Sequence, residues 1–290
     1  MSQHAEFKQK RGGRRFASWC LLVVTIGLLS PSVINGDGVP LGAAGQFAVL
    51  HLGCGSASLG QLKVNTGTIA GDVGIGGGAT GGSQPFGFGK FQKGSIGGAL
   101  VVDLNATSSV VDKNFTVTNG VSGLDLQPAV DDAIAAGAAA AALGGTELGG
   151  FTGGTLAAGV YHATGFDLNK TSLTITGGPS QHFVLNVSGA FDFHQSEIIL
   201  EGGITADNVL FNVLGAGDVV TVGHSDSIFL GDLLAVDREI IISELGVGSP
   251  PGAGPDNPGF LGRIIGGQCT DLILHSGAQV TRPAIQPPPG

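Results

Sequence analysis

The sequence predicts a mainly β fold in which short strands stack coil upon coil as a solenoid, with a single α-helix alongside. Short apolar runs recur in the C-terminal half and begin 21 residues apart, at Ile198, Val219 and Ile240. This spacing lies within the range of solenoid repeats. The 53 glycines among 290 residues supply tight corners between the runs. One Ala-rich segment interrupts the strand pattern and predicts the helix.

Residues 1–36 are typical of a signal peptide. Basic residues precede the apolar run FASWCLLVVTIGLLS (residues 16–30), and PSVING offers a cleavage point near Gly36. We therefore expect a secreted chain with a domain over residues 37–281 and a Pro-rich tail at 282–290. Removing residues 1–36 takes five of 13 basic and one of 22 acidic residues, which leaves eight against 21, a formal net charge of −13. That charge disfavours nucleic acid and anionic membranes as partners.

Strand-like runs are visible in both halves. The N-terminal runs lie at residues 47–53, 63–77, 96–104 and 115–121. In the C-terminal half, FVLNV (183–187) and VLFNV (209–213) are near copies, and the repeated Asn186 and Asn212 predict an internal Asn ladder. The run at Leu272 begins 32 residues after Ile240, a gap that a Pro/Gly-rich loop at residues 246–258 explains.

The predicted helix covers about residues 124–143. Within it Leu126, Val130 and Ile134 are four residues apart, which is the spacing of one helix face. The many alanines would make a thin helix that can lie close against a sheet. Its end signals are a Ser122/Asp125 capping box, Pro128 in the first turn and Gly144 as a stop.

Three T-x-T pairs are the candidate binding residues. Residues i and i+2 of a strand share a face, so Gly67, Val117 and Ile175 would point inward between the threonines. On successive coils such pairs would form a regular array of hydroxyls and methyls. Thr also favours strands, so such pairs can recur by chance. The pairs are Thr66/Thr68, Thr116/Thr118 and Thr174/Thr176.

Candidate catalytic groups are few. Asp192 with His194, and His224 with Asp226, have the spacing of one strand face and could serve as acid and base. No basic cluster accompanies them for an acidic sugar substrate. No Cys/His ligand spacing and no phosphate-binding loop are present either. We therefore expect no enzyme, no cofactor and no metal.

Two cysteines remain after the signal peptide, Cys54 and Cys269. In an oxidising compartment they either pair and tie the two ends of the chain together or stay buried and reduced. Asn-X-Ser/Thr sequons are relevant where the source glycosylates. They lie at Asn105, Asn114, Asn169 and Asn186.

The order of the sequence pieces resembles the secreted ice-binding protein family of bacteria, fungi and algae. The likeness covers about residues 41–280. The family implies a discontinuous right-handed β-solenoid of triangular section with one helix packed alongside, and ice binding through a flat face rich in Thr, Ser and Ala. Its N-terminal strands fold back beside the C-terminal ones, which makes a Cys54–Cys269 pair possible. The matching pieces are GAAGQFAVL (42–50), NTGTIAGDVGI (65–75), GGTLAAGVY (153–161), FVLNVSGAFDF (183–193), NVLFNV (208–213), FLGDLLAVDREIII (229–242) and GRIIGG (262–267).

The resemblance makes ice the first expected partner, bound by a monomer through the Thr pairs. A second resemblance, to anchored bacterial surface proteins with collagen-binding-like β repeats, rests on the same C-terminal strands. The first alternative is therefore an adhesive or matrix protein that binds an extracellular polymer or cell-surface component. A β-helix enzyme acting on polysaccharide is the remote alternative.

Overall fold

The computed structural model describes residues 38–54, 60–77, 89–104, 110–224, 226–245, 259–275 and 277–282. All of them belong to one unit, Gly36–Gly290, and a separate unit, Met1–Asn35, lies outside the described residues. The expected signal peptide, the loop at 246–258, Asn105 and residues 283–290 of the expected tail also lie outside them. No helix in the described part of the chain is long and apolar enough to cross a membrane.

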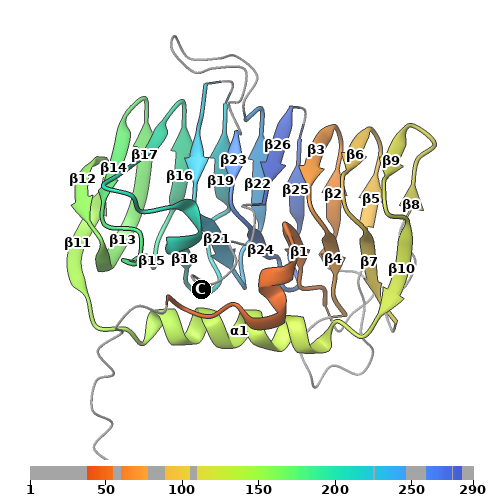
Figure 1. Ribbon diagram of the computed structural model, residues 1–290, viewed down its shortest axis with the longest axis horizontal. Helices are drawn as coiled ribbons and strands as arrows, with labels where there is room; N and C mark the ends of the chain where they lie inside the picture. Colours follow the sequence, from red (N-terminus) through yellow and green to blue (C-terminus); the bar gives the residue numbers. More distant parts are fainter. Residues whose placement is uncertain are drawn as a thin grey trace, which may run out of the picture. The chain divides into compact units, whose positions relative to one another are not determined.

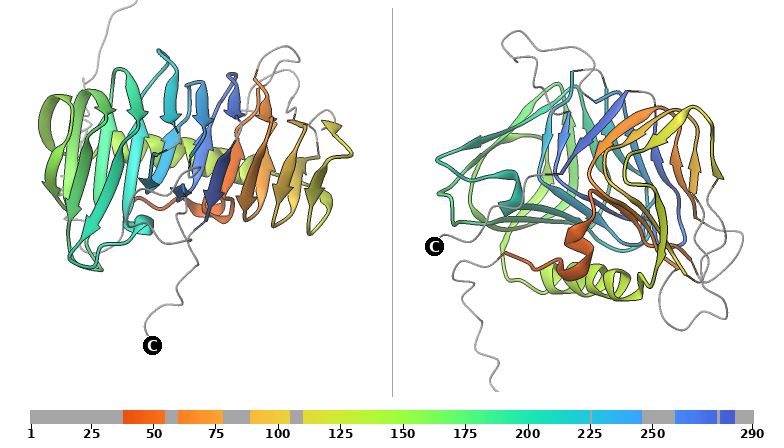
Figure 2. Two further views of the ribbon diagram at one scale, coloured as in Figure 1. Left: turned by 90° about the horizontal axis from the view of Figure 1, so that it is seen from above. Right: turned by 45° about the vertical axis from the view of Figure 1, so that its right-hand side comes forward.

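The described strands pair in parallel and form a stack of coils (Figures 1 and 2). A complete coil gives one strand to each of three faces, here called a, b and c. Face a contains β1 (Val49–His51), β4 (Val73–Ile75), β7 (Leu100–Asp103), β10 (Val121–Leu124), β15 (Phe183–Val187), β18 (Val209–Val213), β21 (Asp232–Ala235) and β24 (Ile264–Gly266). Face b contains β2 (Leu62–Val64), β5 (Gly89–Phe91), β8 (Val110–Val111), β16 (Phe191–His194), β19 (Val220–Gly223), β22 (Ile240–Ser243) and β25 (Leu272–Leu274).

The long strands β11 (Thr146–Phe151) and β13 (Gly159–Asn169) run through both faces a and b and join them into one 17-stranded sheet. Face c is built from a six-stranded and a three-stranded sheet. Its strands are β3 (Gly67–Ala70), β6 (Gly94–Ile96), β9 (Phe115–Val117), β12 (Gly154–Ala157), β14 (Ser172–Thr176), β17 (Glu197–Glu201), β20 (Phe229–Leu230), β23 (Phe260–Leu261) and β26 (Ala278–Thr281).

The order of the coils in space differs from their order in the chain. Strand β1 lies between β4 and β24, so the first coil of the chain stacks on the last described one. After β10, helix α1 (Gln127–Ala141) runs along the stack to β11 at its other end (Figure 1). The mainly β fold with one helix, predicted from the strand runs and the Ala-rich segment, is confirmed.

Inward side chains of successive coils fill the interior of the stack with aromatic rings. The ring centroids of Phe166 and Phe191 are 4.5 Å apart, and those of Phe229 and Phe260 are 4.7 Å apart. Both distances suit attractive ring packing. Glycine corners let adjacent coils approach closely: Gly94 has φ +116°, and a Cβ there would lie 1.9 Å from the carbonyl oxygen of Gly67. The corner therefore excludes any side chain at residue 94.

The predicted 21-residue repeat is wrong. Val220, and not Val219, pairs with Ile240 on face b, and the coil before them contributes Phe191 of β16. Ile198 belongs to β17 on face c. Elsewhere the register joins Phe183 to Val209, 26 residues later. Coil lengths vary because the corners differ in length, so equal spacing does not identify equivalent strands.

Helix α1 packs its small residues against face a. Ala129, Ala133, Ala136 and Ala140 are buried together with the outward side chain of Leu210, which confirms the expected close approach. The predicted capping box is wrong. Leu126 holds the N-cap position without a side-chain cap bond, and Ser122 lies in β10. The end signal at Gly144 is also displaced, because Ala142 is the C-cap residue.

The repeated asparagines do form a ladder, and it lies between face a and the helix. The Asn212 amide nitrogen donates to the Asn186 side-chain oxygen at 2.8 Å and to the Gly137 carbonyl at 3.0 Å. The Asn186 amide nitrogen donates to the Ala140 carbonyl at 2.8 Å. Asn186 is 1% exposed. Its sequon is therefore inaccessible in the folded chain.

The contact between the first and last coils, which we call the seam, consists of β1–β24, β2–β25 and β3–β26. A disulfide joins Cys54 to Cys269 there. Beside it His51 is fully buried, and burial lowers the pKa of His51 from 6.5 to about 4. The Gly53 N–H donates to His51 Nδ1 at 3.2 Å, and Nε2 lies 3.0 Å from the Thr270 carbonyl. This pattern holds the ring neutral, with its proton on Nε2.

Candidate functional site

A row of hydroxyls crosses three neighbouring strands of face c. Strand register places Thr68 of β3 beside Ser95 of β6, and Ser95 beside Thr116 of β9. Thr68 and Thr116 are exposed, and Ser95 is half-buried. Their neighbours Ile69 and Ile96 point inward and are fully buried. The alternation that fills the core thus turns these hydroxyls outward.

The spacing of this row follows from the ladder. Adjacent strands lie about 4.8 Å apart, so the three hydroxyl-bearing residues repeat at about that interval. The β-branched threonines have restricted χ1 angles. Thr68 is also beside Gln279 of β26, which extends the polar row by one strand. The row is a stiff, periodic array of hydroxyl groups, with a methyl group on each of its two threonines.

The first two T-x-T pairs are staggered. Because Thr68 and Thr116 share a row through Ser95, Thr66 lies before that row and Thr118 lies after it. Thr66 directly precedes β3, and its hydroxyl donates to the Asn65 carbonyl at 2.7 Å. Thr118 follows β9, and its backbone N–H bonds the Ile96 carbonyl. Two of the four threonines therefore align, not all four.

The third pair lies further along face c. Thr174 and Thr176 are on β14, where Thr174 pairs with Thr155 of β12 and Thr176 with Ala157. Strands β26, β23, β20 and β17 separate them from Thr68. The three pairs are therefore not on successive coils, since β6 lies between β3 and β9 and these four strands lie between β3 and β14.

Sequence reasoning missed the two hydroxyl residues that lie in register beside the predicted threonines of this face. Ser95 lies in GSI, between Thr68 and Thr116, and Thr155 lies in GGTLA beside Thr174. Neither belongs to a T-x-T pair. Single hydroxyl residues that follow a glycine corner were the available signal, and register was needed to align them.

The candidate catalytic residues lie at the protein surface. Asp192 and His194 lie on the outward side of β16, with His194 Nε2 3.8 Å from Asp192 Oδ1. The side chain of Asp192 is 43% exposed and that of His194 is 40% exposed. His224 follows β19, and Asp226 lies in the turn beyond it. Neither of the pockets described below is lined by any of the four. Among the described residues, no group of three His, Cys, Asp or Glu could hold a metal ion.

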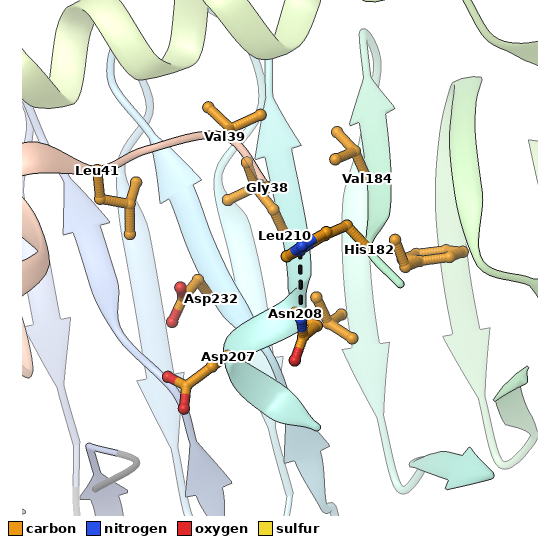
Figure 3. Close-up of a pocket in the computed structure, with 11 residues that line it drawn as sticks. Gly38, Val39, Leu41, His182, Val184, Asp207, Asn208, Leu210 and Asp232 are labelled. Atoms are coloured by element: carbon orange, nitrogen blue, oxygen red, sulfur yellow. Dashed lines mark hydrogen bonds between the residues drawn. The ribbon is translucent and has the colours of Figure 1, made fainter. Parts of the chain in front are cut away.

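A small cavity lies where residues 38–41 pass over β18 (Figure 3). Its volume is about 30 Å³, which suits a water molecule and excludes a sugar. His182 Nδ1 and Asn208 Nδ2 lie 3.3 Å apart at its edge. Asp232 in its wall accepts a 2.6 Å hydrogen bond from Arg263 Nη1, and burial raises the pKa of Asp232 to about 6.

An open hollow of about 340 Å³ adjoins this cavity. Its charged groups are largely used within the chain. Arg263 Nη2 donates to Asp207 at 3.1 Å, Arg263 Nε donates to the Gly45 carbonyl at 3.0 Å, and Arg282 Nη1 donates to the Gln46 carbonyl. These contacts attach the N-terminal 3₁₀ turn η1 (Gly42–Gln46) to the stack.

Comparison with known families agrees with this architecture. The model of a family described as Ice-binding-like matches residues 59–245. The chain belongs to this family. Among curated relatives, an ice-binding protein of Lentinula edodes is 36% identical over 132 residues, which are 44% of this chain and 43% of that protein. Ice-binding protein K3-B1 of Typhula ishikariensis is 27% identical over 210 residues, 70% of this chain and 81% of that protein.

Solved structures of ice-binding proteins share the fold. An ice-binding protein from an Arctic yeast has a TM-score of 0.56 at 23% identity, covering 88% of this chain and 99% of that one. One from the Antarctic ascomycete Antarctomyces psychrotrophicus has a TM-score of 0.53 at 22% identity, covering 87% and 100%. At this identity the likeness shows the solenoid fold alone. Both of these curated relatives are named as ice-binding proteins.

Proposed function

We propose that this protein is a secreted, non-catalytic ice-binding protein whose face c contacts ice. The observation that supports this most is the row Thr116, Ser95 and Thr68, in register on adjacent strands. A surface that holds hydroxyls at one fixed interval, with methyls beside them, can order water above it into a regular layer. Family membership favours this function over an adhesive or matrix role.

The row is suited to a rigid surface. Strands β3 and β6 are paired on both sides and β9 is paired with β6 at the edge of the sheet, which fixes the backbone of the row, and buried Ile69 and Ile96 anchor it from below. Each threonine presents a methyl beside its hydroxyl, and its χ1 angle is restricted. The array is therefore ordered before ice arrives, so little conformational entropy is lost on binding.

The second group, Thr155, Thr174 and Thr176, would add a separate contact at the far end of face c. Between the two groups the outward residues include Leu230, Leu261 and Ile199, which are half-buried and apolar. We assign the main contact to the Thr116–Ser95–Thr68 row because its residues belong to one unbroken six-stranded sheet.

Export and action as a single copy complete the proposal. Residues 1–36 would direct secretion, and a disulfide persists in an oxidising compartment. One copy carries the whole hydroxyl row, so ice contact needs no second subunit.

The test is ice-recrystallisation inhibition and thermal hysteresis of the secreted chain and its variants at low protein concentration. Thr68→Tyr and Thr116→Tyr insert bulk into the row, and each should abolish most of the activity. Thr174→Tyr should reduce it less. The matched control is Thr221→Tyr, because Thr221 is an outward, half-buried strand threonine of face b.

An inactive wild-type chain that is folded by circular dichroism would overturn ice binding. Loss of activity in Thr221→Tyr with full activity in Thr68→Tyr would instead reject face c as the contact and move it to face b. Thermal unfolding of each variant separates loss of contact from loss of fold.

A further inference from the structure

Face b carries a pattern of charge that the proposed ice contact does not use. Strand register aligns one outward residue from each coil in a single row down the middle of this face. In spatial order seven residues of this alignment are Lys90, Lys63, Ile273, Ile241, Thr221, Asp192 and Asp167. Beyond Lys90 the register continues to Val110 of β8. The seven-residue segment, here called the row, is basic at one end, apolar near the centre and acidic at the other end.

The charged ends place like charges side by side. Lys63 pairs directly with Lys90 in register, and Asp192 pairs directly with Asp167. Like charges opposite each other destabilise a sheet. Lys63 has a salt bridge to Asp271 and Asp192 has His194 nearby, but the exposed Lys90 and Asp167 form no salt bridge with any described residue. The arrangement leaves two uncompensated charges of opposite sign at opposite ends of one flat row.

The row is complementary in charge to a second copy of itself that runs in the opposite direction. With Ile241 at the centre, reversal sets Lys90 against Asp167, Lys63 against Asp192, and Ile273 against Thr221. We propose that face b is a self-association surface on which a second copy docks face to face with the long axes of the two stacks antiparallel. The two-fold axis would pass through Ile241 along the strand direction. Such an interface is isologous, so each opposite-charge contact occurs twice.

The size of the row limits the affinity. Seven strands at about 4.8 Å span about 29 Å, and four residues at about 3.3 Å span about 13 Å. The product is roughly 400 Å² per copy, about half of the ~800 Å² that a stable interface buries per partner. The dimer is therefore weak, dependent on concentration and sensitive to salt, since its end contacts are exposed ion pairs. At low concentration the monomer predominates.

The neighbouring rows also bear on this pairing. On one side Ser243 is central, and Gly223 and His275 flank it, so no like-charge contact arises there. On the other side Glu239, directly before β22, would meet Glu239 of the second copy. That contact is unfavourable, which gives a distinctive expectation: Glu239→Gln should strengthen the dimer.

Face c stays open in this arrangement because it is a different side of each coil. The dimer would carry two ice-contact faces, and its formation does not depend on whether ice is the ligand of face c. Removing the charge pattern on face b should therefore leave ice-recrystallisation inhibition at low concentration unchanged.

Sedimentation velocity of the full secreted chain over a wide concentration range tests the proposal. The wild type should show a concentration-dependent dimer that weakens at high salt. Lys90→Glu and Asp167→Lys should each weaken it at least tenfold, because each variant sets like charges against each other at both ends. An equimolar mixture of the two variants should associate again, since every end contact then joins opposite charges. Lys93→Glu is the matched control, an exposed lysine outside the row.

A wild type that stays monomeric up to millimolar concentration at low salt would overturn the proposal. So would equal behaviour of Lys90→Glu and Lys93→Glu, or a mixture of the two reversed variants that fails to associate. Thermal unfolding of Lys90→Glu and Asp167→Lys confirms that both remain folded, which is expected because both side chains are exposed.

Discussion

The β15–β18 junction and the seam at β1–β24 are both parallel ladders, but they are built differently. The first joins five residue pairs from segments 26 residues apart, such as Phe183 with Val209. Within the seam, the β1–β24 ladder joins three pairs whose members are 215 residues apart, such as Val49 with Ile264. The seam adds a disulfide, a buried histidine and side-chain links to its ladder. The β15–β18 junction has one side-chain link of its own, between Asn186 and Asn212, whereas the long-range contact adds a covalent bond and a buried histidine as well.

The difference has a physical reason. Closing a chain over a long separation costs more entropy than closing it over a short one, and three ladder pairs make fewer hydrogen bonds than five. A covalent bond that limits the unfolded chain offsets this cost. The seam should therefore depend on individual side chains more strongly than the β15–β18 junction does.

Removing the disulfide should produce the largest effect. The double variant Cys54→Ala/Cys269→Ala should lower the free energy of unfolding by up to about 5 kcal/mol, because the disulfide closes a very long loop. Urea unfolding followed by circular dichroism measures this loss. Reductant should destabilise the wild type equally and leave the double variant unaffected. A loss below about 1 kcal/mol would mean that the seam is held by its ladder alone.

Acid should produce the second-largest loss of stability at the seam. His51 has a folded pKa of about 4 against 6.5 unfolded, so its contribution is fully present above pH 6.5 and is lost as the pH falls toward 4. The loss is about 3 kcal/mol. Urea unfolding at pH 7 and pH 4 measures it, and His51→Gln, which cannot take up the proton, should flatten this part of the profile. An unchanged profile in His51→Gln would reject the assignment.

The contribution of Asp232 to the free energy of unfolding should change with pH in the opposite direction to that of His51. Its pKa is raised from 3.8 to about 6, so its stabilising contribution is present at low pH and is lost as the pH rises through 6. It lies at the junction between β21 and β24, where it bonds Arg263. In Asp232→Asn the fall in stability between pH 6.5 and pH 4 should therefore be steeper than in the wild type.

A change at the helix-facing ladder should cost less and act elsewhere. Asn212→Ala removes the donor to the Gly137 carbonyl and to Asn186, and should lower the free energy of unfolding by about 2 kcal/mol. Hydrogen exchange should rise in α1 and β18 and stay unchanged in β1 and β24. Increased exchange at the seam would show that the two regions are coupled rather than independent.

The sequence predicted the parts of the fold that depend on local pattern. The Ala-rich segment became α1 because its helical period differs from the strands around it, and the T-x-T alternation correctly turned Gly67 and Ile175 inward. The register between coils could not be predicted, because corner lengths vary. The run at Ile198 is apolar like the face-b strands but belongs to β17 on face c. For the same reason Ser95, the middle of the hydroxyl row, was not identified.

The side-chain link between Asn65 and His275 should have the smallest effect. The Asn65 amide nitrogen lies 3.1 Å from His275 Nδ1 in a half-buried position across the seam. Asn65→Ala should lower the free energy of unfolding by about 1 kcal/mol, since one partly solvated hydrogen bond contributes about that much. If the seam relies on several such links, combining Asn65→Ala with the cysteine double variant should cost more than the sum of the two, because the disulfide holds the strands in register when the link is missing. Double-mutant analysis of urea unfolding measures this coupling, and strict additivity would mean that the disulfide and the link stabilise the seam independently.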